Sequence, residues 1–226
     1  MTVAPGPAPR AAAFDCWIFD LDNTLYAATS NLFAQVDRRI GRYVERLLGL
    51  PPGPARLIQK QLFRDHGTTL RGLMSEHDIA PLEFLDYVHD IDFSIIGPDA
   101  VLAAAIAALP GRKLVFTNAC GRYAANILQR LGIAPLIEAI FDITDADYLP
   151  KPAPATYDRL VARYGIDPRR AIMIEDITRN LVPAAKLGMT TVWVPTDNIW
   201  AREEEDFAHI DYVADDLGGW LAGLAD

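Results

Sequence analysis

Short apolar runs along the chain alternate with stretches in which apolar residues recur every three or four positions. The short runs are typical of buried strands, and the recurring pattern is typical of amphipathic helices. The runs that predict strands are Phe14–Asp20, Lys113–Thr117, Ala139–Ile143, Ala171–Glu175, Thr190–Val194 and Tyr212–Ala214. This alternation predicts an α/β fold, in which a Rossmann-like parallel sheet is covered by helices on both faces.

Helices are expected between these strands and after the last one. The stretches concerned are Asp99–Leu109, Arg122–Leu131, Ala155–Tyr164 and Leu181–Leu187. Gly132, Gly165 and Gly188 follow three of them, and glycine is favoured where a helix ends. Right-handed crossovers place the carboxyl ends of the strands at one edge of the sheet, where α/β proteins bind their ligands.

Between about Ser30 and Asp92 the chain has helical periodicity and no convincing strand. The first helical stretch contains Leu32, Val36, Ile40 and Val44, and the sequence PPGP at 51–54 interrupts the pattern. Further helices are expected at Ala55–His66, Thr69–His77 and Pro81–His89. We therefore predict a loose N-terminal tail at 1–13, an α/β core domain formed by 14–29 and 98–226, and an inserted all-helical cap domain at 30–97.

The 226 residues carry a formal net charge of -9, which disfavours broad binding to nucleic acid. The two cysteines, Cys16 and Cys120, form no CxxC pair, so a disulfide framework is not expected and a reducing cytoplasm is the natural location. No signal peptide and no membrane span are expected. The acidic run Glu203–Asp206 is expected to be a solvated face.

Residues with complementary chemistry lie at the ends of several expected strands or in the loop before a helix. In chain order they are Asp20, Asp22, Thr117, Asn118, Lys151, Glu175 and Asp176. Crowded carboxylates repel one another unless a cation lies between them, and oxygen ligands suit Mg²⁺. The lysine, the threonine and the asparagine offer positive charge and hydrogen-bond donors to a phosphate. The set predicts phosphoryl transfer from a small phosphorylated metabolite.

The two aspartates after the first strand can divide the chemistry. Asp20 is the candidate nucleophile, which would form an aspartyl-phosphate. Asp22 is the candidate acid and base, which would protonate the leaving group and then deprotonate water. That role predicts surroundings that raise the pKa of Asp22.

Four segments resemble the ordered motifs of the haloacid dehalogenase superfamily. They are FDLDNTLY at Phe19–Tyr26, Thr117-Asn118, Lys151-Pro152 and EDITRN at Glu175–Asn180. The resemblance implies Mg²⁺ bound by the Asp20 side chain, the Asp22 backbone carbonyl and Asp176, with Glu175 acting directly or through water. Asn180 stands where some members have a second acid, so the resemblance assigns it no role.

A finer resemblance involves the inserted helices. HGTTLRGL at His66–Leu73, VHDIDFS at Val88–Ser94, VFTNA and the LGI at Leu131–Ile133 are similar to pyrimidine 5′-nucleotidases of the yeast and bacterial type. This resemblance implies a nucleoside monophosphate as the substrate. Thr68, Thr69 and Arg71 are candidate substrate-binding residues, and helix capping with a solvated arginine is the competing explanation of the same residues.

Other functions remain open at this point. A phosphatase or phosphomutase acting on a sugar phosphate would use the same aspartates. A haloacid dehalogenase needs neither a leaving-group acid nor a metal, so Asp22 and Glu175-Asp176 argue against it. A non-enzymatic phospho-acceptor protein that binds Mg²⁺ would also cluster acids, a threonine and a lysine at strand ends.

Overall fold

A computed structural model describes residues 9–197 and 207–224. These residues contain one six-stranded parallel sheet in the order β3-β2-β1-β4-β5-β6. The strands are β1 (Cys16–Phe19), β2 (Arg112–Phe116), β3 (Ala139–Phe141), β4 (Ala171–Glu175), β5 (Thr190–Trp193) and β6 (Tyr212–Val213). The predicted α/β fold with a parallel sheet is confirmed, and β1 lies at its centre.

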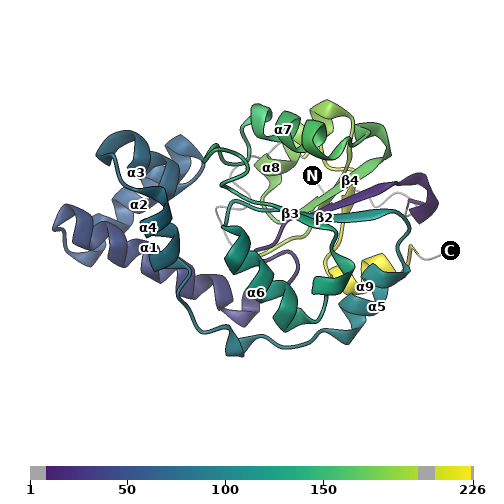
Figure 1. Ribbon diagram of the computed structural model, residues 1–226, viewed down its shortest axis with the longest axis horizontal. Helices are drawn as coiled ribbons and strands as arrows, with labels where there is room; N and C mark the ends of the chain where they lie inside the picture. Colours follow the sequence, from purple (N-terminus) through teal and green to yellow (C-terminus); the bar gives the residue numbers. More distant parts are fainter. Residues whose placement is uncertain (1–8, 198–206, 225–226) are drawn as a thin grey trace.

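Helices cover both faces of the sheet (Figure 1). One layer holds α7 (Pro154–Tyr164) and α8 (Thr178–Leu187), and the other holds α5 (Ala100–Ala108), α6 (Gly121–Leu131) and α9 (Leu217–Ala222). Trp17 and Phe19 pack in the α5, α6 and α9 layer, whereas Cys16 and Ile18 pack in the α7 and α8 layer. The period of two in a strand explains this division, and burial on both faces explains why the run is continuously apolar.

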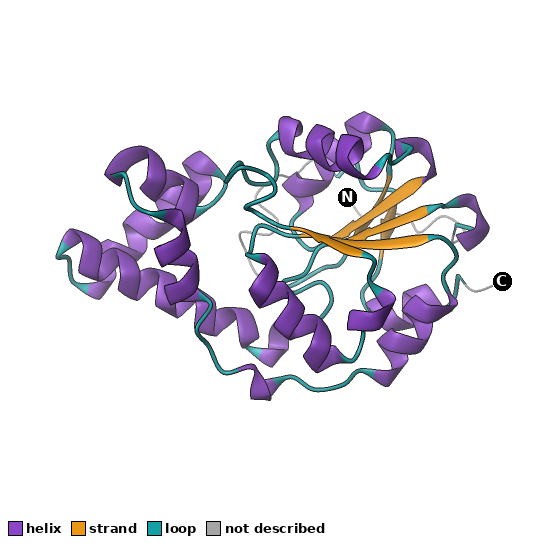
Figure 2. Ribbon diagram, in the orientation of Figure 1, coloured by secondary structure: helices purple, strands orange, loops and turns teal. Residues whose placement is uncertain are grey.

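A helical insertion separates β1 from β2 in the sequence. It consists of α1 (Leu32–Leu48), α2 (Pro52–His66), α3 (Thr69–His77) and α4 (Pro81–Val88). The four helices stand together beside the edge of the sheet where the strands end (Figure 2). This placement puts the insertion over the edge at which the candidate site residues follow their strands.

Two helices begin three residues earlier than the apolar periodicity predicts. α2 starts at Pro52, within the segment expected to interrupt the pattern, because proline lacks only an N–H that has no partner in the first helical turn. α8 starts at Thr178 rather than Leu181. Thr178 and Asn180 are buried polar residues, so the first turn of α8 lacks the apolar pattern that marks the rest.

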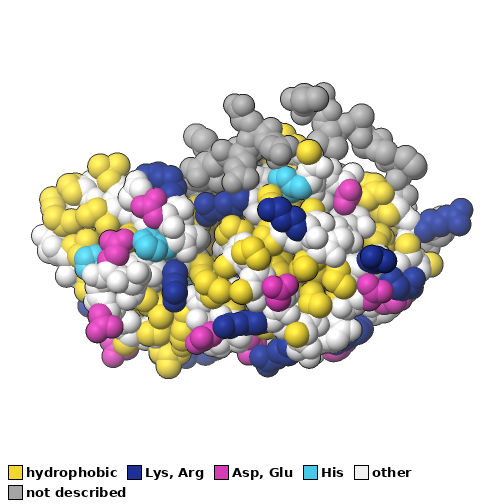
Figure 3. All heavy atoms as spheres, turned by 90° about the horizontal axis from the view of Figure 1, so that it is seen from above, with side chains coloured by type: hydrophobic (Ala, Val, Ile, Leu, Met, Phe, Trp, Pro, Cys, Tyr) yellow, Lys and Arg dark blue, Asp and Glu magenta, His cyan; other side chains and the backbone are white. Residues whose placement is uncertain are grey.

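Some expectations fall on residues outside the described ranges. They are the first eight residues of the predicted tail and the acidic run Glu203–Asp206. Within the remainder of the tail, Ala11–Ala13 form a 3-10 turn and Ala11 is buried. Across residues 9–197 and 207–224, no helix combines the length and the apolar character that crossing a bilayer requires. On the face seen in Figure 3, acidic and basic side chains are interspersed among apolar ones.

Candidate active site

Three acids meet where β1 and β4 end. Asp20 follows β1 directly, Glu175 is the last residue of β4, and Asp176 comes next. All three side chains are buried, and each offers an oxygen that lies within 4.8 Å of the others. β1 and β4 are adjacent parallel strands, and their register brings these carboxylates together although the residues are far apart in the sequence.

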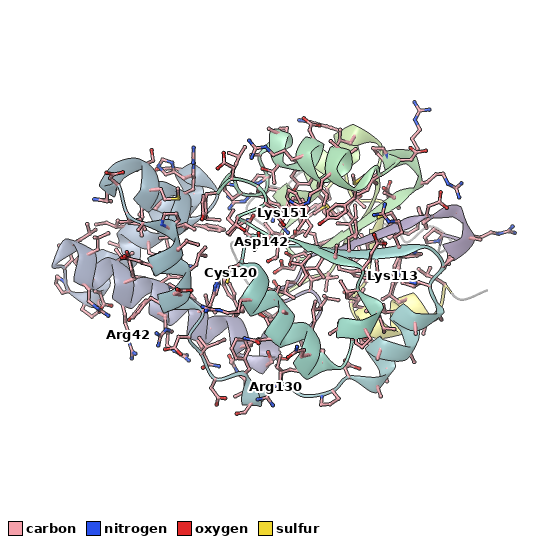
Figure 4. The ribbon with its side chains drawn as sticks, in the orientation of Figure 1. Arg42, Lys113, Cys120, Arg130, Asp142 and Lys151 are labelled. Carbon is pink, nitrogen blue, oxygen red and sulfur yellow. The ribbon has the colours of Figure 1, made fainter. Side chains whose placement is uncertain are left out.

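Lys151 is buried among these acids, with 1% of its surface exposed. Its Nζ donates to Asp20 Oδ1 at 2.6 Å, to Glu175 Oε2 at 2.7 Å and to the backbone carbonyl of Phe116 at 2.8 Å. Figure 4 shows Lys151 at the edge of the sheet that faces the helical insertion. Burial alone would lower the pKa of Lys151, but Asp20 and Glu175 raise it, so the ammonium stays charged.

The acids outnumber this cation. Burial, and then the charge of Glu175, raises the pKa of Asp20 to about 7 despite the contact with Lys151. Burial and the same glutamate raise the pKa of Asp176 well above its ordinary value. The donor set is therefore made of oxygens, is buried and has excess negative charge. A divalent cation such as Mg²⁺ fits that set.

Asp22 lies on the turn that follows β1, and two tyrosines enclose its carboxyl group. The Tyr123 hydroxyl donates to Asp22 Oδ1 at 2.7 Å, and the Tyr26 hydroxyl donates to the same oxygen. Burial raises the pKa of Asp22, and the hydrogen bonds from Tyr26 and Tyr123 offset only part of this effect. The raised pKa that the sequence predicted for this residue is confirmed.

Thr117 and Asn118 follow β2 at the same edge. Thr117 is buried, and its Oγ1 accepts a hydrogen bond from the Ala119 amide at 3.0 Å, which leaves its own hydroxyl proton available. The Asn118 Oδ1 accepts from the Lys151 amide at 2.8 Å, and its Nδ2 donates to the Lys151 carbonyl at 3.3 Å. The amide of Asn118 therefore holds the loop that carries Lys151.

A cavity of about 150 Å³ lies between the acids and the helical insertion. The insertion contributes mainly apolar walls, among them Phe33, Phe63 and Phe84. Asp37 and Gln59 add polar groups, and the Gln59 Nε2 donates to Asp37 Oδ1 at 2.8 Å. The cavity is therefore open to Asp20 and Asp22 at one side and lined by aromatic rings at the other.

The candidate substrate-binding residues are not all brought to this cavity. Thr68 and Thr69 line it. However, Thr68 Oγ1 accepts from the Arg71 amide at 3.1 Å and caps α3, while Thr69 Oγ1 donates to the Gln59 carbonyl at 3.3 Å. Arg71 instead lines a separate depression together with Arg179.

Sequence reasoning assigned no role to the tyrosines at Asp22. Tyr26 lies within the first motif, where its position gave a signal that could have been used. Tyr123 lies on α6, where its spacing is that of an ordinary core residue. Asn180, for which the sequence gave no role, is buried and lines the cavity, and its backbone carbonyl accepts from the Tyr157 hydroxyl at 2.5 Å.

Comparison with known proteins adds the family. A family model described as haloacid dehalogenase-like hydrolase matches residues 14–188, which include β1 to β4 and the whole helical insertion. The chain belongs to this family. As a haloacid dehalogenase-like hydrolase, it carries Asp20, Lys151 and Asp176 within the matched region.

Individual relatives of this haloacid dehalogenase-like hydrolase are distant. Phosphate metabolism protein 8 of Saccharomyces cerevisiae is 25% identical over an alignment of 203 residues, and the match covers 82% of this chain and 62% of that protein. The chain thus spans less than two thirds of the length of this curated relative.

Solved structures share the fold at low identity. CbbY from Rhodobacter sphaeroides, solved in complex with phosphate, has a TM-score of 0.63 and 17% identity over 93% of this chain and 96% of its own. YfnB from Bacillus subtilis, solved bound to magnesium, has a TM-score of 0.54 and 14% identity over 88% of this chain and 93% of its own.

Proposed function

We propose that the chain is a magnesium-dependent phosphomonoester hydrolase that works through an aspartyl-phosphate, and more narrowly a pyrimidine 5′-nucleotidase. The observation that carries the proposal is the buried Lys151, which joins Asp20 to Glu175 beside Asp176 and Asp22. This arrangement supplies a nucleophile, a fixed positive charge, a set of oxygen ligands and a second carboxyl group of raised pKa. These are the groups that phosphoryl transfer needs.

In the proposed reaction, an oxygen of Asp20 attacks phosphorus and the bond to the leaving oxygen breaks. Asp22 gives its proton to that oxygen, and later takes a proton from the water that attacks the aspartyl-phosphate. Lys151 neutralises charge near Asp20, and Thr117 can donate its hydroxyl proton to a phosphate oxygen. Asp20, the Asp22 carbonyl and Asp176 would hold Mg²⁺, which supplies charge stabilisation when bound.

The presence of Asp22 supports a phosphate ester, and not a haloacid, as the substrate. Halide leaves without needing a proton, so a dehalogenase has no use for a carboxyl group of raised pKa beside the nucleophile. A sugar-phosphate phosphatase or mutase would use the same core residues. Only the leaving group that the insertion selects would differ.

A nucleotide is the favoured substrate because of the cavity beneath the insertion. The rings of Phe33, Phe63 and Phe84 suit a planar base, and Gln59 lies among them. We propose that residues 30–97 act as the cap that selects the leaving group. Thr68 and Thr69 are its proposed polar contacts within this cavity.

A phosphate-release screen with Mg²⁺ tests both levels of the proposal. The panel comprises UMP, CMP, AMP, ribose 5-phosphate and a haloacid assayed for halide. We expect UMP and CMP to have kcat/KM values about tenfold or more above those of the other esters, a ratio that pocket contacts can supply. Equal values for all esters would contradict the nucleotidase assignment alone, whereas halide release without phosphate release would contradict the phosphatase assignment.

Magnesium should stabilise the protein more at pH 8 than at pH 6. The pKa of Asp20 is raised to about 7 in the folded, metal-free site, so the folded state keeps a proton that the unfolded chain loses above about pH 4. The stability of the metal-free protein therefore falls as the pH rises from about 4 to 7. Bound Mg²⁺ favours the ionised carboxylate and removes this penalty at high pH.

The measurement is Tm with excess Mg²⁺ minus Tm with EDTA, recorded at pH 6, 7 and 8. We expect this difference to grow with pH. An Asp15→Asn control removes a carboxylate at the other end of β1 and should leave the trend intact, because Asp15 pairs with Arg170 at the surface. A difference that is constant or shrinks with rising pH would argue against metal binding at Asp20.

A further inference from the structure

Two buried phenols converge on one oxygen of Asp22. Tyr26, from the segment after β1, and Tyr123, from the first turn of α6, both donate to Oδ1. Their own hydroxyl oxygens lie 3.5 Å apart. Among the residues that the structure describes, none donates a hydrogen bond to Oδ2 of Asp22. The carboxyl group is thus held through one oxygen, and the other is left for a further partner.

Packing alone does not require these hydroxyls. Tyr26 and Tyr123 are 6% and 1% exposed, so phenylalanine would fill the same space without burying a polar group. A buried hydroxyl is destabilising unless it has a partner, and each of these has Asp22 as its acceptor. The two hydroxyls therefore act on the Asp22 carboxyl group, and their hydrogen bonds restrict its rotation.

The helical insertion also contacts this pair. His89, which follows α4, stacks on the ring of Tyr123 with centroids 4.2 Å apart and planes 21° apart. The His89 Nδ1 lies 3.2 Å from Cys120 Sγ, and the ring of Phe93 lies 5.8 Å from that of Tyr123. Burial, together with Arg122, lowers the pKa of His89 to about 3, so its ring is neutral and acts as a packing surface.

The start of α6, just before Tyr123, is fixed to the core. The Gly121 amide, at the start of α6, donates to Asp142 Oδ2 at 2.5 Å. Asp142 follows β3, and Figure 4 shows it beside Cys120 at the edge of the sheet that faces the insertion. The first turn of α6 is therefore anchored to the sheet, while the ring of Tyr123 is covered by the insertion.

We infer that Tyr26 and Tyr123 are positioning residues, which turn Oδ2 of Asp22 toward the leaving group, and that His89 holds Tyr123 in place. This inference rests on the proposed phosphatase function. With Oδ1 occupied, Oδ2 carries the proton that passes to the leaving oxygen as its bond to phosphorus breaks and the bond from Asp20 forms. Oδ2 then accepts a proton from the attacking water as the Asp20–phosphorus bond breaks.

The test compares two aryl esters, phenyl phosphate and p-nitrophenyl phosphate, in the presence of Mg²⁺. Phenolate is the poorer leaving group and depends more on protonation by Asp22. Tyr123→Phe and Tyr26→Phe should lower kcat/KM for phenyl phosphate about tenfold more than for p-nitrophenyl phosphate. They should also slow hydrolysis of the aspartyl-phosphate, so that a burst of nitrophenolate appears before the steady state.

Tyr157→Phe is the matched control, because it removes a buried hydroxyl that bonds the Asn180 carbonyl and does not touch Asp22. It should leave the ratio between the two esters unchanged. His89→Phe keeps a ring on Tyr123 and should preserve the wild-type ratio, whereas His89→Ala should shift it in the direction of Tyr123→Phe.

The outcomes separate the two levels of the claim. Wild-type protein that releases phosphate from neither aryl ester nor any ester of the screening panel overturns the proposed function and this inference with it. Wild-type protein that hydrolyses both esters, with tyrosine variants that lower both rates equally or not at all, overturns the positioning role alone. Circular dichroism and Mg²⁺ affinity should match the wild type in each variant scored.

Discussion

Asp20→Asn is expected to reduce phosphate release by roughly a thousandfold or more, because the amide cannot form the aspartyl-phosphate through which the reaction proceeds. The fold should survive the change. An asparagine oxygen can still accept the hydrogen bond from Lys151 Nζ, and one of the crowded buried charges is removed. We therefore expect unchanged or higher thermal stability in EDTA at pH 8, together with weaker stabilisation by Mg²⁺.

The control for this variant lies at the opposite end of β1. Asp15→Asn alters an exposed acid that pairs with Arg170 before β1 begins, and it should leave turnover within about twofold of the wild type. Rapid quench with labelled substrate should trap phosphoprotein in the wild type and none in Asp20→Asn. Turnover retained by Asp20→Asn would refute the nucleophile assignment, whatever the substrate.

The residues at the strand ends could be found from the sequence because two patterns coincide there. An apolar run such as that ending at Phe19 predicts a buried strand, and a charged residue directly after it marks the strand end. Topological rules then bring Asp20 and Glu175 together without any knowledge of side-chain geometry. The same reasoning predicted the parallel sheet, because strands buried on both faces carry no alternation.

The surroundings of Asp22 could not be found in this way. Tyr123 lies 101 positions from Asp22, on an amphipathic helix where an aromatic residue is expected to be part of the core. His89 reaches Tyr123 only because the insertion packs against α6, and periodicity cannot predict how separate helices meet. Asn118 shows the same limit, since its type suggested a phosphate donor while its amide bonds the backbone of Lys151.

The positions of the candidate substrate-binding residues in the insertion could not be predicted for a related reason. The sequence placed Thr68 and Arg71 in one motif, but a helix start turns them in different directions. Thr68 faces the cavity and caps α3, whereas Arg71 lines the depression that it shares with Arg179. The aromatic walls at Phe33, Phe63 and Phe84 come from three helices, and each reads as ordinary core at helical spacing. Chemistry at strand ends is thus easier to predict than selectivity formed between helices.

Lys151→Met should lower both activity and stability, and a second substitution should separate the two effects. Removing the ammonium leaves Asp20 and Glu175 buried without their cation, which is expected to reduce the free energy of unfolding in EDTA by about 3–5 kcal/mol. Methionine has a similar length, so little of this loss would come from a cavity. Lys186→Met, on the exposed side of α8, should change stability by no more than about 0.5 kcal/mol.

Adding Glu175→Gln to Lys151→Met removes one of the two buried carboxylates that lost their counter-charge. The double variant should recover much of the lost stability in urea unfolding, because the remaining acids repel one another less. Phosphate release should not recover, since the positive charge beside Asp20 is still missing and one oxygen ligand has gone. Activity that returned with stability would mean that Lys151 only holds the fold. Stability without activity in the double variant, together with activity retained by Glu175→Gln alone, identifies the lysine as part of the phosphate site.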